Sequence, residues 1–134
     1  ITGGRAYQSI YQFITHALIV DGHEVPTAHL AETVVEVEEK VIEPGVVYAR
    51  DVAWMRAAGA LIAEVSVPSH GVGYEIGYAL GLNKPVLCLH EQGRPVSKMI
   101  TGNPHPNLQV SAYRTAAQTV ELVHEFIAGI SQTL

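Results

Sequence analysis

One continuous stretch constrains this chain most: an apolar run, a glycine-rich turn and the start of a helix follow one another directly. Residues 60–67 are almost all apolar, which is typical of a strand buried on both faces of a parallel sheet. The turn after them contains Gly71 and Gly73, and Glu75 falls in the first turn of the predicted helix. Because glycines let a backbone approach a ligand and a helix start offers free N–H groups, we expect a phosphate-type anion to bind here beside a carboxylate.

Strands and helices alternate along the rest of the chain. Further strands are predicted at residues 24–27, 85–90 and 108–111, and helices at 7–21, 31–42, 46–58, 73–82 and 115–130. This alternation predicts one α/β domain, 1–134, whose parallel sheet is covered by helices on both faces. A Gly-Gly turn usually follows another element, so we expect a first strand upstream of Gly3 and Gly4 that is missing from this chain. With that strand, the pattern predicts a doubly wound, flavodoxin-like sheet of five strands.

Both glycine turns are expected at one edge of this sheet. Ligands of doubly wound sheets bind beyond the carboxyl ends of the strands, where the turn at 3–5 and the turn at 68–75 would lie. Ser69 adds a hydroxyl to the free N–H groups and Arg5 adds a cation, so a phosphate could be held without a lysine. Glu75, at the positive end of its helix, is expected to have a lowered pKa, which suits a nucleophile.

Glu64 stands inside the apolar run at 60–67. A carboxylate in such a place is costly unless it is paired or lies at the exposed end of the strand. It is therefore either a third acidic group near the site or a structural partner for a backbone turn, and the structural role is favoured.

Charge and composition exclude several classes of protein. The net charge is −5 and basic residues are scattered, whereas a nucleic-acid binder normally has a basic patch. Cys88 is the single cysteine, which excludes a disulfide framework and suits a reducing compartment. No apolar run has membrane-spanning length, and the seven histidines show no metal-ligand spacing. We expect a cytoplasmic protein, with the nucleus as a second location, that uses no metal or cofactor and binds neither nucleic acid nor membranes.

Short motifs follow one another in order along the chain: Gly3-Gly4-Arg5, Thr27-Ala28-His29, Asp51 with Trp54, and the segments 63–65, 68–75, 87–89, 97–100 and 109–110. By these motifs the chain resembles the 2′-deoxynucleoside 5′-phosphate N-hydrolases, close relatives of the nucleoside 2-deoxyribosyltransferases. The resemblance extends from the first residue to about Tyr113. Its most specific part is the Pro-Ser-x-Gly-Val-Gly-Tyr-Glu run at 68–75.

The resemblance implies hydrolysis of the N-glycosidic bond of a 2′-deoxynucleoside 5′-monophosphate to a free base and 2-deoxyribose 5-phosphate. It implies that Glu75 is the nucleophile and forms a covalent glutamyl–sugar intermediate, and that Asp51 assists at the sugar and base. It also implies that Ser69 and Gly71 bind the 5′-phosphate.

The same resemblance implies a homodimer in which Ser97 and Met99 of one chain complete the site of its neighbour. It places His29 near the active site. The full predicted substrate- and phosphate-binding set is Ser69, Gly71, Gly73, Ser97, Gly3, Gly4, Arg5, His29 and Met99.

Two other functions remain open from the sequence. A nucleoside 2-deoxyribosyltransferase would share Glu75 but pass the sugar to a second base. A non-catalytic nucleotide-binding module would bind the same ligands and release no product. The three functions differ in what they form: hydrolysis products, exchanged bases, or nothing.

Overall fold

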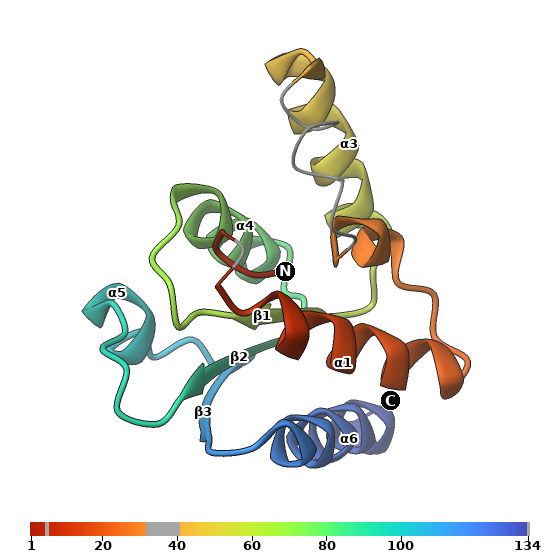
Figure 1. Cartoon of the computed structure of the whole chain (residues 1–134). Helices are drawn as coiled ribbons and strands as arrows, with labels where there is room; N and C mark the ends of the chain where they lie inside the picture. The colour runs from red at the N-terminus through yellow and green to blue at the C-terminus, as the bar shows by residue number, and fades with distance from the viewer. Residues whose placement is uncertain (5, 32–40, 134) are drawn as a thin grey trace.

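The computed structural model describes residues 1–4, 6–31 and 41–133. Its core is a parallel sheet with the strand order β1 (Leu61–Glu64), β2 (Val86–Glu91) and β3 (Leu108–Tyr113) (Figure 1). Neighbouring strands are in register through Cys88, which lies opposite Ala63 on one side and Val110 on the other. The predicted α/β class is therefore confirmed.

Helices cover both faces of this sheet. On one face lies α4 (His70–Gly81), and on the other α1 (Gln8–Val20) and α6 (Ala116–Thr133) lie side by side (Figure 1). The remaining elements are η1 (Pro26–Ala31), which contacts α1; α3 (Pro44–Ala57), which packs against α4 and extends beyond the sheet; and the short α5 (Lys98–Thr101).

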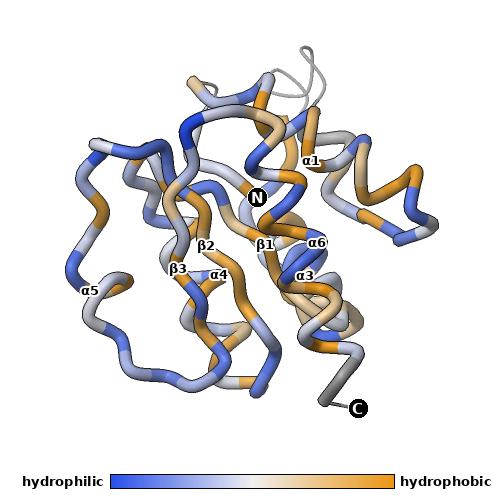
Figure 2. The backbone as a smooth tube through the Cα atoms, turned by 90° about the horizontal axis from the view of Figure 1, so that it is seen from below, coloured by the Kyte–Doolittle hydropathy of each residue, from blue (hydrophilic) through white to orange (hydrophobic). Residues whose placement is uncertain are grey.

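The burial of β2 explains its continuous apolar sequence. Side chains alternate between the faces of a strand, so Val86 and Cys88 pack against α4 whereas Leu87 and Leu89 pack against α1 and α6. All four side chains are fully buried. Figure 2 shows β2 as a largely hydrophobic segment enclosed by the helices. The core thus has two halves, one on each face of the sheet.

Two predictions about strands differ from the structure. The strand predicted at 24–27 is wrong: the chain is irregular up to Val25, and η1 begins at Pro26, which has no N–H for a sheet ladder. A five-stranded sheet is not confirmed, because the described residues contain three strands. At the edge of β1 away from β2, Thr2 forms a single parallel bridge with Glu64, whose N–H donates to the carbonyl of Ile1 over 2.7 Å.

The helix bounds also differ in one way that matters for the site. The helix predicted at 73–82 begins earlier, at His70, because Ser69 caps it: the Ser69 Oγ accepts a hydrogen bond from the Val72 N–H over 3.3 Å. Glu75 therefore lies in the second turn of α4 and not in the first. The helix predicted at 31–42 falls mostly outside the described residues. No described helix has both the length and the apolar character needed to cross a membrane.

Candidate active site

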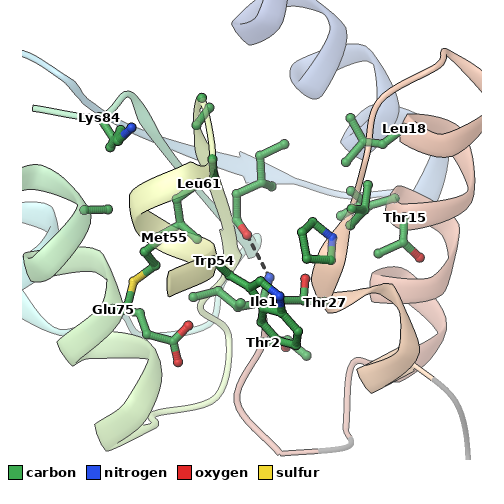
Figure 3. Close-up of a pocket in the computed structure, with 18 of the residues that line it drawn as sticks. Ile1, Thr2, Thr15, Leu18, Thr27, Trp54, Met55, Leu61, Glu75 and Lys84 are labelled. Carbon is green, nitrogen blue, oxygen red and sulfur yellow. Dashed lines mark hydrogen bonds between the residues drawn. The ribbon is translucent and has the colours of Figure 1, made fainter. Parts of the chain in front are cut away.

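A cavity of about 890 Å³ opens beside β1, between the helices of the two faces (Figure 3). Its walls come from the first residues of the chain, α1, η1, α3, the turn after β1, and α4. It brings together several residues predicted from the sequence: Gly4, Asp51, Ser69, Gly71 and Glu75. The segments that carry them are far apart in the chain, so the fold alone assembles this group.

The turn that leads into α4 has the features of an anion site. The N–H groups of Val72 and Gly73 are bonded to the Ser69 side chain and carbonyl, over 3.3 and 3.1 Å. Those of His70 and Gly71 have no hydrogen-bond partner among the described residues, as expected at a helix start. Two free donors and a serine hydroxyl at the positive end of a twelve-residue helix can hold a phosphate.

Gly71 leaves space between the two predicted functional side chains. A Cβ added at this position would lie 3.8 Å from Glu75 Oε1 and 3.9 Å from Ser69 Oγ. The carboxylate and the hydroxyl therefore face the same small volume beside the bare backbone of Gly71. A ligand that binds the helix start comes directly against Glu75.

The Gly3-Gly4 turn lies against the turn after β1, as predicted. A Cβ on Gly3 would stand only 2.5 Å from the Val67 carbonyl oxygen and 3.0 Å from Ser69 Cβ, so a side chain does not fit there. Gly4 has a φ of +61°, which favours glycine. The two glycine turns thus form one continuous wall of the cavity.

The pKa of Glu75 is raised, not lowered as the sequence analysis expected. Burial raises it to about 7, and the negative charge of Asp51 raises it further in the same direction. Arg50 acts in the opposite sense but is outweighed. The field of a helix end is strongest in the first turn, and Glu75 lies beyond it, so desolvation decides the shift.

Asp51 and Trp54 reach the cavity together from α3, because residues three apart lie on one face of a helix. The Arg50 Nε donates to Asp51 Oδ1 over 2.8 Å, and the Arg50 guanidinium lies 4.7 Å from the centre of the Trp54 ring. Figure 3 shows Trp54 and Glu75 facing the same space. An acid, a cation and an indole ring are therefore held next to the nucleophile candidate.

Glu64 is the structural partner that the sequence analysis favoured. Its Oε1 accepts the Ser66 N–H over 2.6 Å, and its Oε2 accepts the Ser66 hydroxyl over 2.9 Å and the hydroxyl of Tyr113. Burial, and next this hydrogen bond, raise the pKa of Tyr113. Glu64 also lines the cavity and so lies near the site, but both of its oxygens already accept hydrogen bonds from Ser66 and Tyr113.

Several predicted residues do not reach the cavity within one chain. Ser97 caps α5, accepting the Met99 N–H over 3.2 Å; both residues are exposed, and neither lines the cavity. Gly73 is exposed and lies outside the cavity wall. Two predicted site residues lie outside the part of the chain that the structure describes: Arg5, and the side chain of His29. The backbone of His29 belongs to η1.

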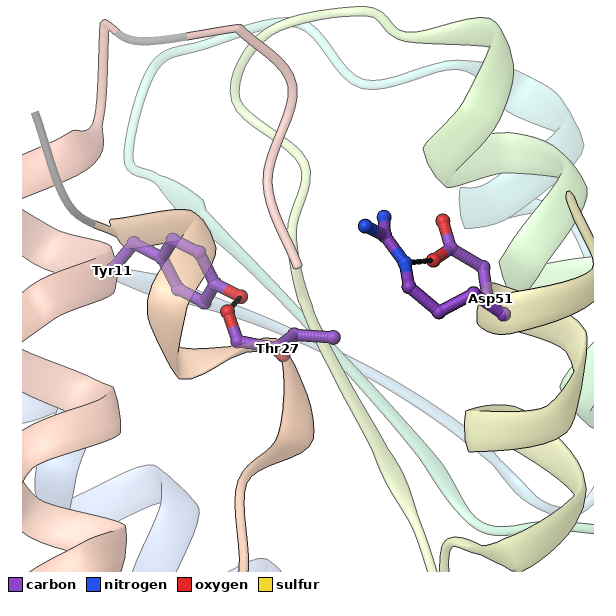
Figure 4. Close-up of polar contacts among 4 residues, drawn as sticks. Tyr11, Thr27 and Asp51 are labelled. Carbon is purple, nitrogen blue, oxygen red and sulfur yellow. Dashed lines mark hydrogen bonds and ion pairs between the residues drawn. The ribbon is translucent and has the colours of Figure 1, made fainter. Parts of the chain in front are cut away.

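Sequence reasoning missed part of the opposite wall. Tyr11 lies in the helix predicted at 7–21 at a spacing typical of core packing; it is buried, but it also lines the cavity, where its hydroxyl donates to the Thr27 carbonyl over 3.0 Å. Figure 4 shows this pair across from the Arg50–Asp51 ion pair. Burial raises the pKa of Tyr11 to about 12, so it remains a neutral donor. Its helical spacing fits core packing equally well, so no sequence signal separated the two roles.

No set of three or more His, Cys, Asp and Glu side chains is placed to hold a metal ion in the described part of the chain. The polar groups of the cavity include carboxylates, hydroxyls and backbone N–H groups, together with the side chains of His23 and Lys84. Such a set can bind an anionic group at one end and carry out nucleophilic and proton-transfer chemistry at the other.

Comparison with known proteins gives consistent matches. The nucleoside 2-deoxyribosyltransferase family model matches residues 7–125. A Methanosarcina mazei protein named as a 2′-deoxynucleoside 5′-phosphate N-hydrolase is 42% identical over 97% of this chain and 81% of its own length. The mouse 5-hydroxymethyl-dUMP N-hydrolase is 43% identical over 76% of this chain and 61% of its own length.

A solved structure shares the fold. The CMP N-glycosidase of Clostridium botulinum superposes with a TM-score of 0.73 over 93% of this chain and 96% of its own. Because the two sequences are only 19% identical, this similarity supports the fold and nothing finer.

Replacing Gly71 with Ala tests the anion site. The new methyl group would fill the space between Glu75 and Ser69, while alanine favours the helix, so the variant should fold and bind inorganic phosphate about tenfold more weakly. Calorimetric titration of phosphate measures this. Gly77→Ala is the matched control, since Gly77 lies in α4 with open space around its Cα. An equal loss in both variants, or none in either, would contradict the site.

Proposed function

Because the chain belongs to the nucleoside 2-deoxyribosyltransferase family, we propose that it is an N-glycosidase that hydrolyses 2′-deoxynucleoside 5′-monophosphates to a free base and 2-deoxyribose 5-phosphate. One observation carries the proposal: Glu75, Asp51 and the capped helix start at Ser69 meet in one cavity. The names of the N-hydrolase relatives support the same substrate class.

The phosphate end of the substrate would anchor the molecule. The Ser69 hydroxyl and the free N–H groups of His70 and Gly71 would bind the 5′-phosphate oxygens at the start of α4. Since a Cβ on Gly71 would stand 3.8 Å from Glu75 Oε1, the sugar attached to that phosphate lies within reach of the carboxylate. Anchoring the phosphate thus orients the reacting carbon.

The reaction would proceed in two displacements. An oxygen of ionised Glu75 forms a bond to the anomeric carbon of the sugar, and the electron pair of the broken C–N bond leaves with the base. Asp51, whose charge is paired with Arg50, orients the sugar, and the departing base takes up a proton from solvent. Water then attacks the same carbon and breaks the glutamyl ester; Glu75 leaves as the carboxylate, and the proton that the water loses goes to solvent.

The pH dependence of this reaction should follow Glu75. Its pKa of about 7 means that the carboxylate is protonated below neutral pH, so kcat/KM should rise as pH increases through about 7. In Asp51→Asn the repelling charge is gone and the pKa of Glu75 falls, so the rising limb should move to lower pH although the rate is reduced. A pH–rate profile of base release measures both; a limb that stays in place or moves to higher pH would contradict this electrostatic coupling.

The decisive experiment is chromatography of free base released from deoxynucleoside monophosphates, deoxynucleosides and ribonucleotides, each with and without a second free base. We expect release from the deoxynucleoside monophosphates only, unaffected by the added base. Glu75→Gln should slow release by at least about a thousandfold, because the nucleophile is lost. Glu121→Gln, an exposed position on α6, is the matched control.

The other outcomes of this panel identify the alternatives. Exchanged bases formed from unphosphorylated deoxynucleosides would indicate a nucleoside 2-deoxyribosyltransferase. Tight binding of monophosphates with no product would indicate a nucleotide-binding module.

We further propose that the site is completed in a homodimer by Ser97 and Met99 of the neighbouring chain. Supporting this, Met99 is an apolar side chain that is 84% exposed in the single chain, beside the Ser97 hydroxyl. Burial in an interface would remove this apolar surface from water.

Mixing inactive variants tests the shared site. A Ser97→Ala chain paired with a Glu75→Gln chain has one complete site, so equal mixtures that exchange subunits should regain about a quarter of wild-type activity. Base release after mixing measures this recovery. Activity that stays at the sum of the two unmixed variants would contradict a site built from two chains.

A further inference from the structure

We propose that Glu64 is a positioning residue, whose buried carboxylate holds the turn between β1 and α4 in the geometry that binds the phosphate of the ligand. The proposal rests on the proposed function for the identity of that ligand as a sugar 5-phosphate. It assigns Glu64 no contact with the reacting atoms.

The Glu64 carboxylate is buried together with its hydrogen-bond partners. Glu64 and Ser66 are each 1% exposed and Tyr113 is 3% exposed. Among the described residues no Lys, Arg or His forms an ion pair with Glu64. A carboxylate in such a place is stable only if hydrogen bonds replace its water, and the three donors from Ser66 and Tyr113 supply them.

One of these hydrogen bonds joins the Glu64 side chain to the backbone of the turn that follows β1. The carboxylate folds over its own backbone and accepts the N–H two residues later, which fixes the bend at the point where the chain leaves the sheet. Ser69, the cap of α4 and the proposed phosphate ligand, follows Ser66 after only two intervening residues. A shift of the Ser66 bend would therefore move the Ser69 hydroxyl.

The same hydrogen bonds also connect the bend at Ser66 to the other two strands of the sheet. The Ser66 Oγ accepts the N–H of Glu91 at the end of β2 over 2.9 Å, and Tyr113 contributes its hydroxyl from the end of β3. Glu64 itself ends β1. The carboxyl ends of all three described strands are thus linked through the Glu64 carboxylate and the Ser66 hydroxyl, next to the turn that we propose binds the anion.

The Gly3-Gly4 turn packs against the same segment of chain, so its position depends on the position of the Ser66 bend. Gly3 is packed so closely on Val67 and Ser69 that even a Cβ would collide. Thr2, the residue before Gly3, also pairs with the backbone of Glu64 through a parallel bridge. Loss of the Glu64 contacts would therefore loosen both turns together.

Binding of 2-deoxyribose 5-phosphate to Ser66→Ala and Tyr113→Phe tests the proposal. Each variant removes one donor to Glu64 and leaves every proposed ligand-binding residue in place. We expect about tenfold weaker binding in calorimetric titration, and a KM for the monophosphate that rises more than kcat falls. The matched control is Val123→Ala, which creates a cavity in the core cluster that also contains Tyr113 but removes no hydrogen-bond donor to Glu64. It should lower stability but leave the affinity within about twofold.

The positioning role of Glu64 and the proposed function are tested by different measurements, so one can fail without the other. Unchanged affinity in both donor variants, with circular dichroism showing that they are folded, would overturn the positioning role. An equal loss in Val123→Ala, or no binding by the wild-type protein, would overturn it as well. Base release by the wild-type protein tests the proposed function by itself, because the affinity comparison needs binding and no turnover.

Discussion

The buried carboxylate of Glu64 is the interaction on which the rest of this structure depends. It lies at the carboxyl ends of the three described strands and accepts hydrogen bonds from Ser66 and Tyr113. A charge in this position has no water to stabilise it, so its donors must be kept in place whenever the chain is folded. The hydrogen bonds to Ser66 also fix the turn before α4, so the geometry of the proposed anion site depends on how this carboxylate is stabilised.

The carboxylate of Glu75 shows the opposite use of burial. It is half-buried against the cavity, and this burial raises its pKa to about 7. Asp51 adds repulsion from α3, and Arg50 compensates only in part. One acid is thus held by hydrogen-bond donors, while the other has a pKa close to neutral pH. The first gives rigidity and the second gives reactivity.

The cavity is assembled from elements that lie on different sides of the sheet. The anion end comes from one short piece of chain, because a strand, a turn and a helix start are contiguous in sequence. The wall that faces it comes from α3, η1 and α1. Trp54 and the Arg50–Asp51 pair reach the space from α3, and the hydroxyl of Tyr11 reaches the Thr27 carbonyl from α1. A nucleotide would therefore touch local and distant segments at once.

The sequence by itself determined the features that depend on near neighbours in the chain. These are the buried strand β2, the capped glycine turn after β1, and the family, since its specific motif lies within residues 68–75. Two expectations were wrong. The strand expected at 24–27 does not form, because η1 begins at Pro26. Glu75 lies beyond the first turn of α4, because the Ser69 cap makes this helix begin at His70. Only the tertiary structure decided that Asp51 stands near Glu75 and that Tyr113 satisfies Glu64. Desolvation and hydrogen bonding between distant segments exist only after packing, so no pattern of adjacent residues carries them.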